Sequence, residues 1–184
     1  MSMKPFWVWI FLFLVGTSLF ASRRPDLTID VAADVFSLDA NTNQVVAKGH
    51  VVVKQRNVVV KGDSALYDRA ADKVHLTGRV VLTQGKTVMT CTQIEVFGVE
   101  NRVVAKGDVR VQSGEIIGTS GGADYFLDDD YVVLWDRPEV KTLRDLATGD
   151  KVIIDFKKQF IRSSGSSRLS LSKQSLQKKG NSVQ

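Results

Sequence analysis

The sequence predicts an all-β fold built from a 29-residue repeat. Residues 45–53 (VVAKGHVVV) recur at residues 103–111 (VVAKGDVRV) with seven of nine residues identical. A related segment at residues 74–82 lies midway between them, so Gly49, Gly78 and Gly107 are each 29 residues apart. Apolar and polar residues alternate within each copy, which indicates strands. A fixed period of this kind indicates one strand unit stacked on copies of itself.

The expected strands follow one another at short intervals from residue 27 to residue 160. Glycine-centred strands are expected at residues 45–53, 74–82 and 103–111, and a fourth at residues 132–140 has Asp136 in place of glycine. A second set of strands with the same period is marked by Ala65/Tyr67, Ile94/Val96, Ala123/Tyr125 and Val152/Ile154. Turn residues separate the strands at 39–43, 55–57, 68–72, 84–86, 100–101, 113–115 and 128–130. Such short connections make successive strands antiparallel neighbours.

The repeated glycines lie in the middle of their strands, where glycine usually marks a sharp bend or a close backbone approach. Stacked in a column, they would crease the sheet along one line and fold it into two facing layers. The apolar positions change parity after Gly62, so we expect a bulge on the strands opposite the glycine strands. The sequence therefore predicts an antiparallel β-jelly-roll, or β-taco, of about ten or eleven strands over residues 22–162.

Both ends of the chain differ from the repeat region. Residues 1–21 carry Lys4 followed by an apolar run, and Ala21 precedes Ser22 at a suitable cleavage point, so we expect a signal peptide. An uncleaved membrane anchor is the alternative, because the apolar run is nearly long enough to span a bilayer. Residues 163–184 are rich in Ser, Lys, Gln and Gly and lack aromatic residues. We expect them to form a basic, disordered tail.

Charge and cysteine content exclude several classes of protein. Three positive charges precede residue 25 and four follow residue 162, with no acidic residue in either segment, so the net charge of +5 leaves about −2 for the repeat region. A nucleic-acid partner is therefore not expected, since a binding face should be basic. Cys91 is the only cysteine, so no intramolecular disulfide is possible, and we expect a packed, inert thiol.

The sequence carries little that points to catalysis. His50 and His75 have no cysteine or carboxylate companions at ligand spacing, so no metal or cofactor is expected. No nucleophile elbow, P-loop or zinc-protease motif is present, and we expect a protein that is not an enzyme.

The predicted inner face is rich in small and β-branched residues and poor in Phe and Trp. One interpretation is an ordinary sandwich core. The other is a slot for acyl chains, because valines would not fill the roughly 10 Å between two sheets. The candidate groove residues are Val51, Val53, Val58, Val60, Tyr67, Leu76, Val80, Leu82, Ile94, Val96, Val109, Val111, Tyr125 and Leu134.

An open sheet also leaves two edges for strand addition. We expect Ile29 and Val31 at the first edge, where no lysine or proline would block pairing, and Ile154 and Phe156 at the last. Joining the last edge of one molecule to the first edge of the next would be a heterologous contact that propagates.

Two consecutive segments carry a resemblance to a known family. Residues 60–68 (VKGDSALYD) and 74–84 (VHLTGRVVLTQ) resemble the OstA-like motif, in which a stretch of the type KADxAxYD leads into LTGNVxLxQ. This is the LptA/OstA-like lipopolysaccharide-transport family, and the resemblance covers residues 27–160. Gly62 stands where alanine is usual and Arg79 where asparagine is usual.

The resemblance implies a fold, a cargo and partners. It implies a β-jelly-roll in the periplasm of a Gram-negative bacterium, with lipid A acyl chains of lipopolysaccharide in a hydrophobic groove. It also implies edge-strand contacts with homologous jelly-roll proteins of the inner- and outer-membrane complexes, and head-to-tail self-association. A membrane-anchored, LptC-like component of the same pathway is the nearest alternative. A ligand-free structural β-repeat protein of the envelope and a polysaccharide-active enzyme are more distant ones.

Overall fold

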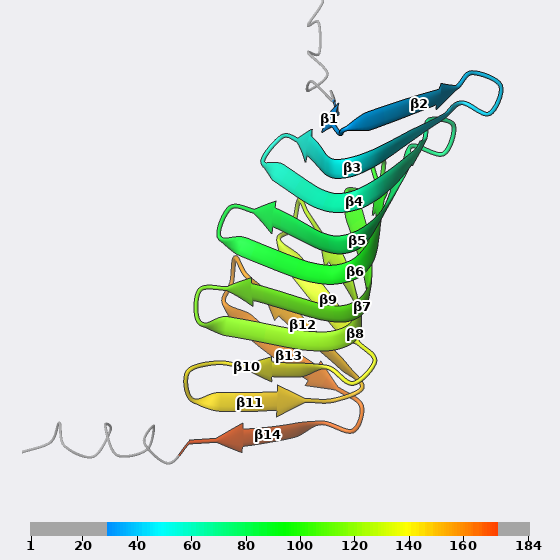
Figure 1. Ribbon diagram of the computed structural model, residues 1–184. Coiled ribbons are helices and arrows are strands. Elements are labelled where there is room, and N and C mark those ends of the chain that lie inside the picture. The colour runs from blue at the N-terminus through cyan, green and yellow to red at the C-terminus, as the bar shows by residue number, and fades with distance from the viewer. Residues whose placement is uncertain (1–28, 173–184) are drawn as a thin grey trace, which may run out of the picture.

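Within residues 29–172, which the computed structural model describes, the chain folds as one antiparallel sheet of fourteen strands and contains no helix. This confirms the predicted all-β, antiparallel jelly-roll. The six longest strands pair in sequence order, each with the next, and account for most of the sheet (Figure 1). They are β3 (Gln44–Gln55), β4 (Val58–Asp68), β5 (Lys73–Gln84), β6 (Thr87–Phe97), β7 (Arg102–Ser113) and β8 (Ile116–Phe126).

Shorter strands divide the sheet into two walls at each end. At the first end, β1 (Asp30–Ala32) pairs with the second half of β3, and β2 (Val35–Asp39) pairs with the first half. At the other end, β10 (Glu139–Lys141) and β9 (Tyr131–Trp135) pair with the two halves of β8. Beyond them, β11 (Asp145–Thr148) and β14 (Arg168–Leu171) extend the first wall, and β12 (Lys151–Asp155) and β13 (Phe160–Ser164) extend the second.

The first wall thus contains β1, β10, β11 and β14, the second wall contains β2, β9, β12 and β13, and both contain one half of each strand from β3 to β8. Figure 1 shows β9, β12 and β13 behind β7, β8 and β10, so the two walls face each other. The count exceeds the predicted ten or eleven strands because the short strands at the ends belong to only one wall each.

The predicted column of mid-strand glycines forms the crease between the walls. Gly49, Gly78 and Gly107 have left-handed backbones with φ of 76°, 78° and 78°, and the residue after each glycine is left-handed as well. The pairing of β3 with β4 jumps here from Lys48↔Ser64 to Val51↔Gly62, so two residues of β3 face one of β4. The extra residue is on the glycine strand, not on the opposing strand as expected. A left-handed backbone costs glycine little conformational free energy, so the extra residue of the bulge lies on the strand that contains the glycine.

The crease continues with the same period to the end of the sheet. Asp136 and Arg137, at the next step of 29, have φ of 61° and 57°, and Gly165, one step further, has φ of 85°. Gly165 lies between β13 and β14 and carries the chain from one wall to the other. The sheet therefore extends past the boundary predicted at residue 162. Residues 173–184, the rest of the predicted tail, lie outside the described residues, as do residues 1–28.

The hairpins of the second wall repeat with the same period. Their left-handed residues are Asn43, Asp72, Asn101, Asp130 and Gln159. Successive hairpins are joined by backbone hydrogen bonds whose donors are also 29 residues apart, and we call this series the loop ladder. Its bonds run from Arg69 N to Asn43 O (3.2 Å), Gly98 N to Asp72 O (3.1 Å), Leu127 N to Asn101 O (2.9 Å) and Phe156 N to Asp130 O (3.0 Å).

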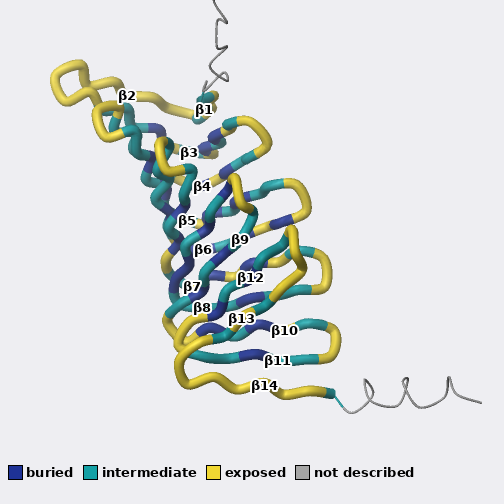
Figure 2. Tube along the Cα trace, turned by 180° about the vertical axis from the view of Figure 1, so that it is seen from behind, coloured by how far each residue is buried: buried dark blue, intermediate teal, exposed yellow. Residues whose placement is uncertain are grey.

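The core lies between the two walls along their whole length. Figure 2 shows buried residues distributed along the long strands, whereas the hairpins, β2 and β14 are exposed. Inward positions of consecutive strands face each other, as in Val53↔Val60 and Leu76↔Ile94. Val, Leu and Ile at alternate positions therefore form one continuous hydrophobic cluster.

Candidate functional site

The candidate site is the interior between the walls, and it contains all fourteen predicted groove residues. Eleven of them are buried members of a single hydrophobic cluster, and Val58, Tyr67 and Val96 are partly buried and pack against it. The alternation in the sequence was therefore sufficient to assign the inner face. Whether these residues contact a lipid remains a prediction.

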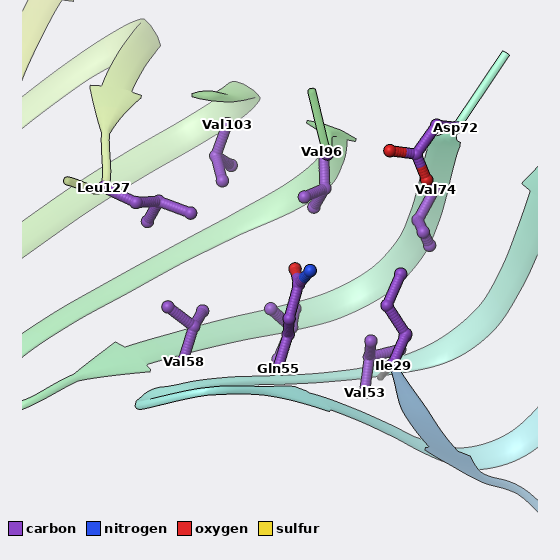
Figure 3. Close-up of a pocket in the computed structure, with 11 residues that line it drawn as sticks. Ile29, Val53, Gln55, Val58, Asp72, Val74, Val96, Val103 and Leu127 are labelled. Atoms are coloured by element: carbon purple, nitrogen blue, oxygen red, sulfur yellow. The ribbon is translucent and has the colours of Figure 1, made fainter. Parts of the chain in front are cut away.

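The interior opens at the end of the sheet that carries β1. Here a small pocket with a cavity volume of about 20 Å³ lies between the walls. Figure 3 shows Ile29, Val53 and Val58 on one side and Val96 and Val103 on the other, with their side chains pointing into the space between. Gln55 and Asp72 supply polar atoms beside these apolar side chains.

Sequence reasoning did not place seven residues of this pocket in the groove, among them the apolar Val74, Val103 and Leu127. A signal for two of them was present. Steps of 29 from the inward-facing Val45 lead to Val74 and Val103, both of which are buried.

A second opening lies at the other end, where β11 and β14 face β13. Ala147, Ile161, Leu169 and Leu171 line a cavity of about 350 Å³. Asp145 also lines it, and its buried Oδ1 has no hydrogen-bond partner among the described residues. The sequence did not reveal this opening because residues 163–171 were expected to be disordered.

Between the two openings the walls are in contact. Gly118 of β8 shows how tightly they pack, since a Cβ atom placed there would lie 2.6 Å from Cδ1 of Leu134 and 3.1 Å from Cδ1 of Ile154. Tyr125, Leu76 and Leu134 are fully buried in this region. In this state the middle of the interior is a packed core, and a continuous groove would require the walls to separate.

Polar contacts join the free ends of the two walls. Nε2 of Gln84, on the first wall, donates a hydrogen bond of 2.9 Å to the carbonyl of Leu127, on the second. Arg56 and Asp128 form an exposed ion pair of 3.5 Å across the same opening. These contacts, with the loop after β8 at their centre, hold the walls together at their open side.

Tyrosines at the inner face are anchored by the hairpins of the second wall. The hydroxyl of Tyr125 donates to Asp130 at 2.6 Å, and Tyr67, two repeats earlier, donates to Asp72 at 3.3 Å. Burial, and then the hydrogen bond to Asp130, raise the pKa of Tyr125 far above its usual range. The ring therefore stays neutral and fixed within the core.

The remaining titratable candidates are separate from the interior or inert. Burial raises the pKa of the Cys91 thiol to about 11, as expected for a packed cysteine. His50 and Arg79 lie on the outer side of the crease, 2.8 Å from Asp34 and 2.9 Å from Asp63, and the Arg79 hydrogen bond lowers the pKa of Asp63. Among the described residues no group of three or more His, Cys, Asp or Glu side chains is arranged to hold a metal ion.

The structure places the predicted edge residues at a free edge of the sheet at one end but not at the other. Ile29 and Val31 lie at the first edge, where β1 pairs only with β3. Ile154 is on β12, which pairs with both β9 and β13, and its side chain is fully buried. Phe156 packs edge-on against Tyr125, with ring centroids 6.3 Å apart. The last edges are β13 and β14, because the crease at Gly165 adds β14 and joins it to the end of β13, residues that the sequence reading assigned to the tail.

The fold and interior define a class: an open, creased β-jelly-roll whose two walls enclose apolar side chains and whose end strands are unpaired. A family described as LptA/(LptD N-terminal domain) LPS transport protein matches residues 59–160, more than half of the chain. The protein belongs to this family, which confirms the resemblance seen in the sequence.

Among solved structures, the chain is similar to LptH, the LptA homologous periplasmic component of the lipopolysaccharide transport device from Pseudomonas aeruginosa. The identity is 19%, the match covers 79% of this chain and 95% of that chain, and the TM-score is 0.35. The comparison with curated proteins finds no match. Within residues 29–172 no helix is long and apolar enough to cross a membrane, and the predicted signal peptide or anchor at residues 1–21 lies outside this range.

Proposed function

We propose that this protein is a periplasmic lipopolysaccharide transport protein that holds lipid A acyl chains between its two walls. Membership of the LPS transport family supports the cargo. The observation that carries the site is an apolar interior that opens at both ends of the sheet, next to edge strands. A carrier that joins others end to end needs openings at these two places.

The energetics favour acyl chains over polar cargo. Burying about a dozen methylenes at roughly 0.8 kcal/mol each gives a gross gain of order 10 kcal/mol before ordering costs. Entry at the first opening replaces solvent beside Val58 and Val96 without exposing buried polar atoms of the sheet. Deeper entry, toward Ile94 and Val109, requires the walls to move apart and the Gln84–Leu127 and Arg56–Asp128 contacts to break.

Photo-crosslinking tests the cargo directly. A photoreactive phenylalanine analogue at Val96, which lines the first opening, should capture added lipopolysaccharide, and one at Ile94 should capture it where the lipid goes deeper. The matched controls are Lys48 and Lys106, exposed outward positions on β3 and β7. Equal labelling at inward and outward positions would show that the interior is only a core, as the ligand-free structural alternative requires.

We infer that the protein also contacts homologous jelly-roll proteins, including copies of itself, through its edge strands. The first edge carries no lysine or proline within β1 or β2, so nothing in these strands opposes pairing. The anchored alternative is decided by N-terminal sequencing of protein isolated from the cell envelope. A mature chain that begins after Ala21 supports a free periplasmic carrier, and one that begins near Met1 supports the anchored form.

A further inference from the structure

We propose that Leu127 is a gate between the first opening of the interior and a second, larger cavity at the free ends of the walls. Leu127 is the first residue of the loop at residues 127–130, and Gln84 and Arg56 hold this loop closed from the first wall. The proposal rests on the proposed function, because the group that passes the gate is an acyl chain of the cargo. It adds the route that this acyl chain takes beyond the first opening.

The second cavity is much larger than the first opening. It lies between the hairpins of the two walls and has a volume of about 940 Å³, and Ile116, Phe156 and Ile161 are apolar members of its lining. The first opening has a volume of about 20 Å³, which accommodates roughly one water-sized group. An acyl chain that enters the first opening therefore stops there unless the space beyond it becomes accessible.

Leu127 stands between the two cavities. Of the residues that the structure describes, it is the only one that lines both of them. Figure 3 shows its side chain pointing into the first opening from the side opposite Ile29. The residue is 9% exposed, so its side chain occupies the passage in the closed state. Displacing this side chain joins the two cavities and leaves the packed centre around Leu134 in place.

Two polar contacts tie the loop to the first wall in the described part of the chain. Nε2 of Gln84 donates to the carbonyl of Leu127 at 2.9 Å, and the guanidinium of Arg56 lies 3.5 Å from the carboxylate of Asp128. The ion pair is exposed, so solvent screening leaves it little strength. The hydrogen bond has a cost, because Oε1 of Gln84 is buried and has no partner among the described residues. Burial of this acceptor offsets part of what the hydrogen bond contributes, so closure is only weakly favoured.

The second wall, by contrast, holds the loop firmly. The amide of Leu127 donates to the carbonyl of Asn101 at 2.9 Å, and the side-chain amide of Asn101 donates to Asp128 at 2.9 Å. Asp130 accepts a hydrogen bond of 2.6 Å from the hydroxyl of Tyr125. These contacts lie within one wall, so they persist when the first wall releases the loop. The loop then moves with the hairpins of its own wall and carries Leu127 out of the passage.

A covalent tether tests the gate. Arg56→Cys and Asp128→Cys, made in one chain and joined by a bis-maleimide linker, tie the loop to the first wall. The matched control is Asn101→Cys with Asp128→Cys, which carries the same linker within the second wall. Purified lipopolysaccharide is then added to each protein. A photoreactive phenylalanine analogue reports its capture at Val96, before the gate, or at Phe156, beyond the gate.

The tether between the walls should lower capture at Phe156 at least about tenfold relative to the control tether, because it removes the open state, and should leave capture at Val96 within about twofold. The buried Cys91 is retained in both proteins and is common to the comparison. Capture at Phe156 that does not depend on the tether would overturn the gate, because the lipid would then enter the second cavity from solvent. Equal loss at both positions would also overturn it. Absence of capture at Val96 in the untethered protein would instead refute the cargo.

A second variant tests how the gate is held closed. Gln84→Met keeps the length of the side chain but removes the hydrogen bond to Leu127. It should raise the rate of capture at Phe156 by about two- to tenfold, the change that corresponds to the net contribution of one hydrogen bond, and leave capture at Val96 unchanged. The matched control is Gln112→Met, the same change at an exposed position of β7, which should alter neither rate. An unchanged or slower rate in Gln84→Met would show that Gln84 does not hold the gate.

Discussion

Replacing Gly107 with alanine is the sharpest test of the crease. Gly107 has φ of 78°, and a Cβ atom at this position would lie 2.0 Å from the hydroxyl oxygen of Thr92. That hydroxyl donates a 3.0 Å hydrogen bond to the carbonyl of Lys106. The substitution therefore both strains the backbone and displaces a side chain that satisfies a main-chain carbonyl.

The expected cost follows from these two effects. Left-handed backbone costs an alanine roughly 1–2 kcal/mol, and loss of a hydrogen bond costs about 1 kcal/mol more. Gly107→Ala should therefore lower the free energy of unfolding by about 2–3 kcal/mol. The matched control is Gly85→Ala, because Gly85 has φ of 57° and no heavy atom within 4 Å of the added Cβ. It should cost only about 1–2 kcal/mol, the strain alone.

Urea denaturation monitored by circular dichroism measures both values. A double variant tests whether the clash can be relieved. One period further along the crease, the left-handed residue is Asp136, and the residue that covers it is Gly121. Combining Gly107→Asp with Thr92→Gly copies that arrangement and should recover stability relative to Gly107→Asp alone. The reasoning is refuted if Gly107→Ala costs no more than Gly85→Ala, or if the added Thr92→Gly change destabilises further.

Three further predictions concern the core. Cys91 should react with a thiol reagent at pH 8 far more slowly in the folded than in the urea-unfolded protein. Its folded pKa of about 11 is above the ordinary 9.0, so its contribution to stability should be complete below pH 9 and disappear as the pH rises to 11. Unfolding curves of the protein and of Cys91→Ala, recorded across this pH range, measure that contribution. Tyr125→Phe should cost about 1.5–3 kcal/mol in urea denaturation, because Asp130 loses a buried partner, and Tyr67→Phe should cost less. Leu82→Ala, at a fully buried position, should cost about 2–5 kcal/mol, against no more than about 0.5 kcal/mol for the partly exposed Val88→Ala; equal costs would contradict the assigned inner face.

The parts of the fold that the sequence predicted are those with a periodic signal. Alternation placed Val51, Leu76 and the other groove residues on one face, and the spacing of Gly49, Gly78 and Gly107 located the crease. The left-handed conformation of the residue after each glycine was not predictable in the same way. His50, Arg79 and Asp108 differ chemically, so nothing in their identity marks the shared backbone geometry.

The last edge was predicted wrongly because the composition of residues 163–171 was given more weight than the 29-residue period. Serines and arginines in residues 163–171 resemble a solvated tail, so Ile154 became the last edge by default. Gly165 lies on the same 29-residue count as the earlier crease residues, and extending the count would have placed β13 and β14 in the sheet. The openings depend on packing between segments far apart in the chain, such as Gln55 of β3 and Leu127 after β8, for which a single sequence gives no pairing information.

The identical length of every repeat has a consequence for how this architecture can change in size. One unit contributes two strands, and neighbouring strands are about 4.8 Å apart, so duplication of 29 residues would lengthen the molecule by about 10 Å. Both termini of the sheet would keep their surfaces, because the added unit begins and ends at equivalent points of the crease. Molecular span is therefore adjustable in fixed increments, independently of what either end recognises.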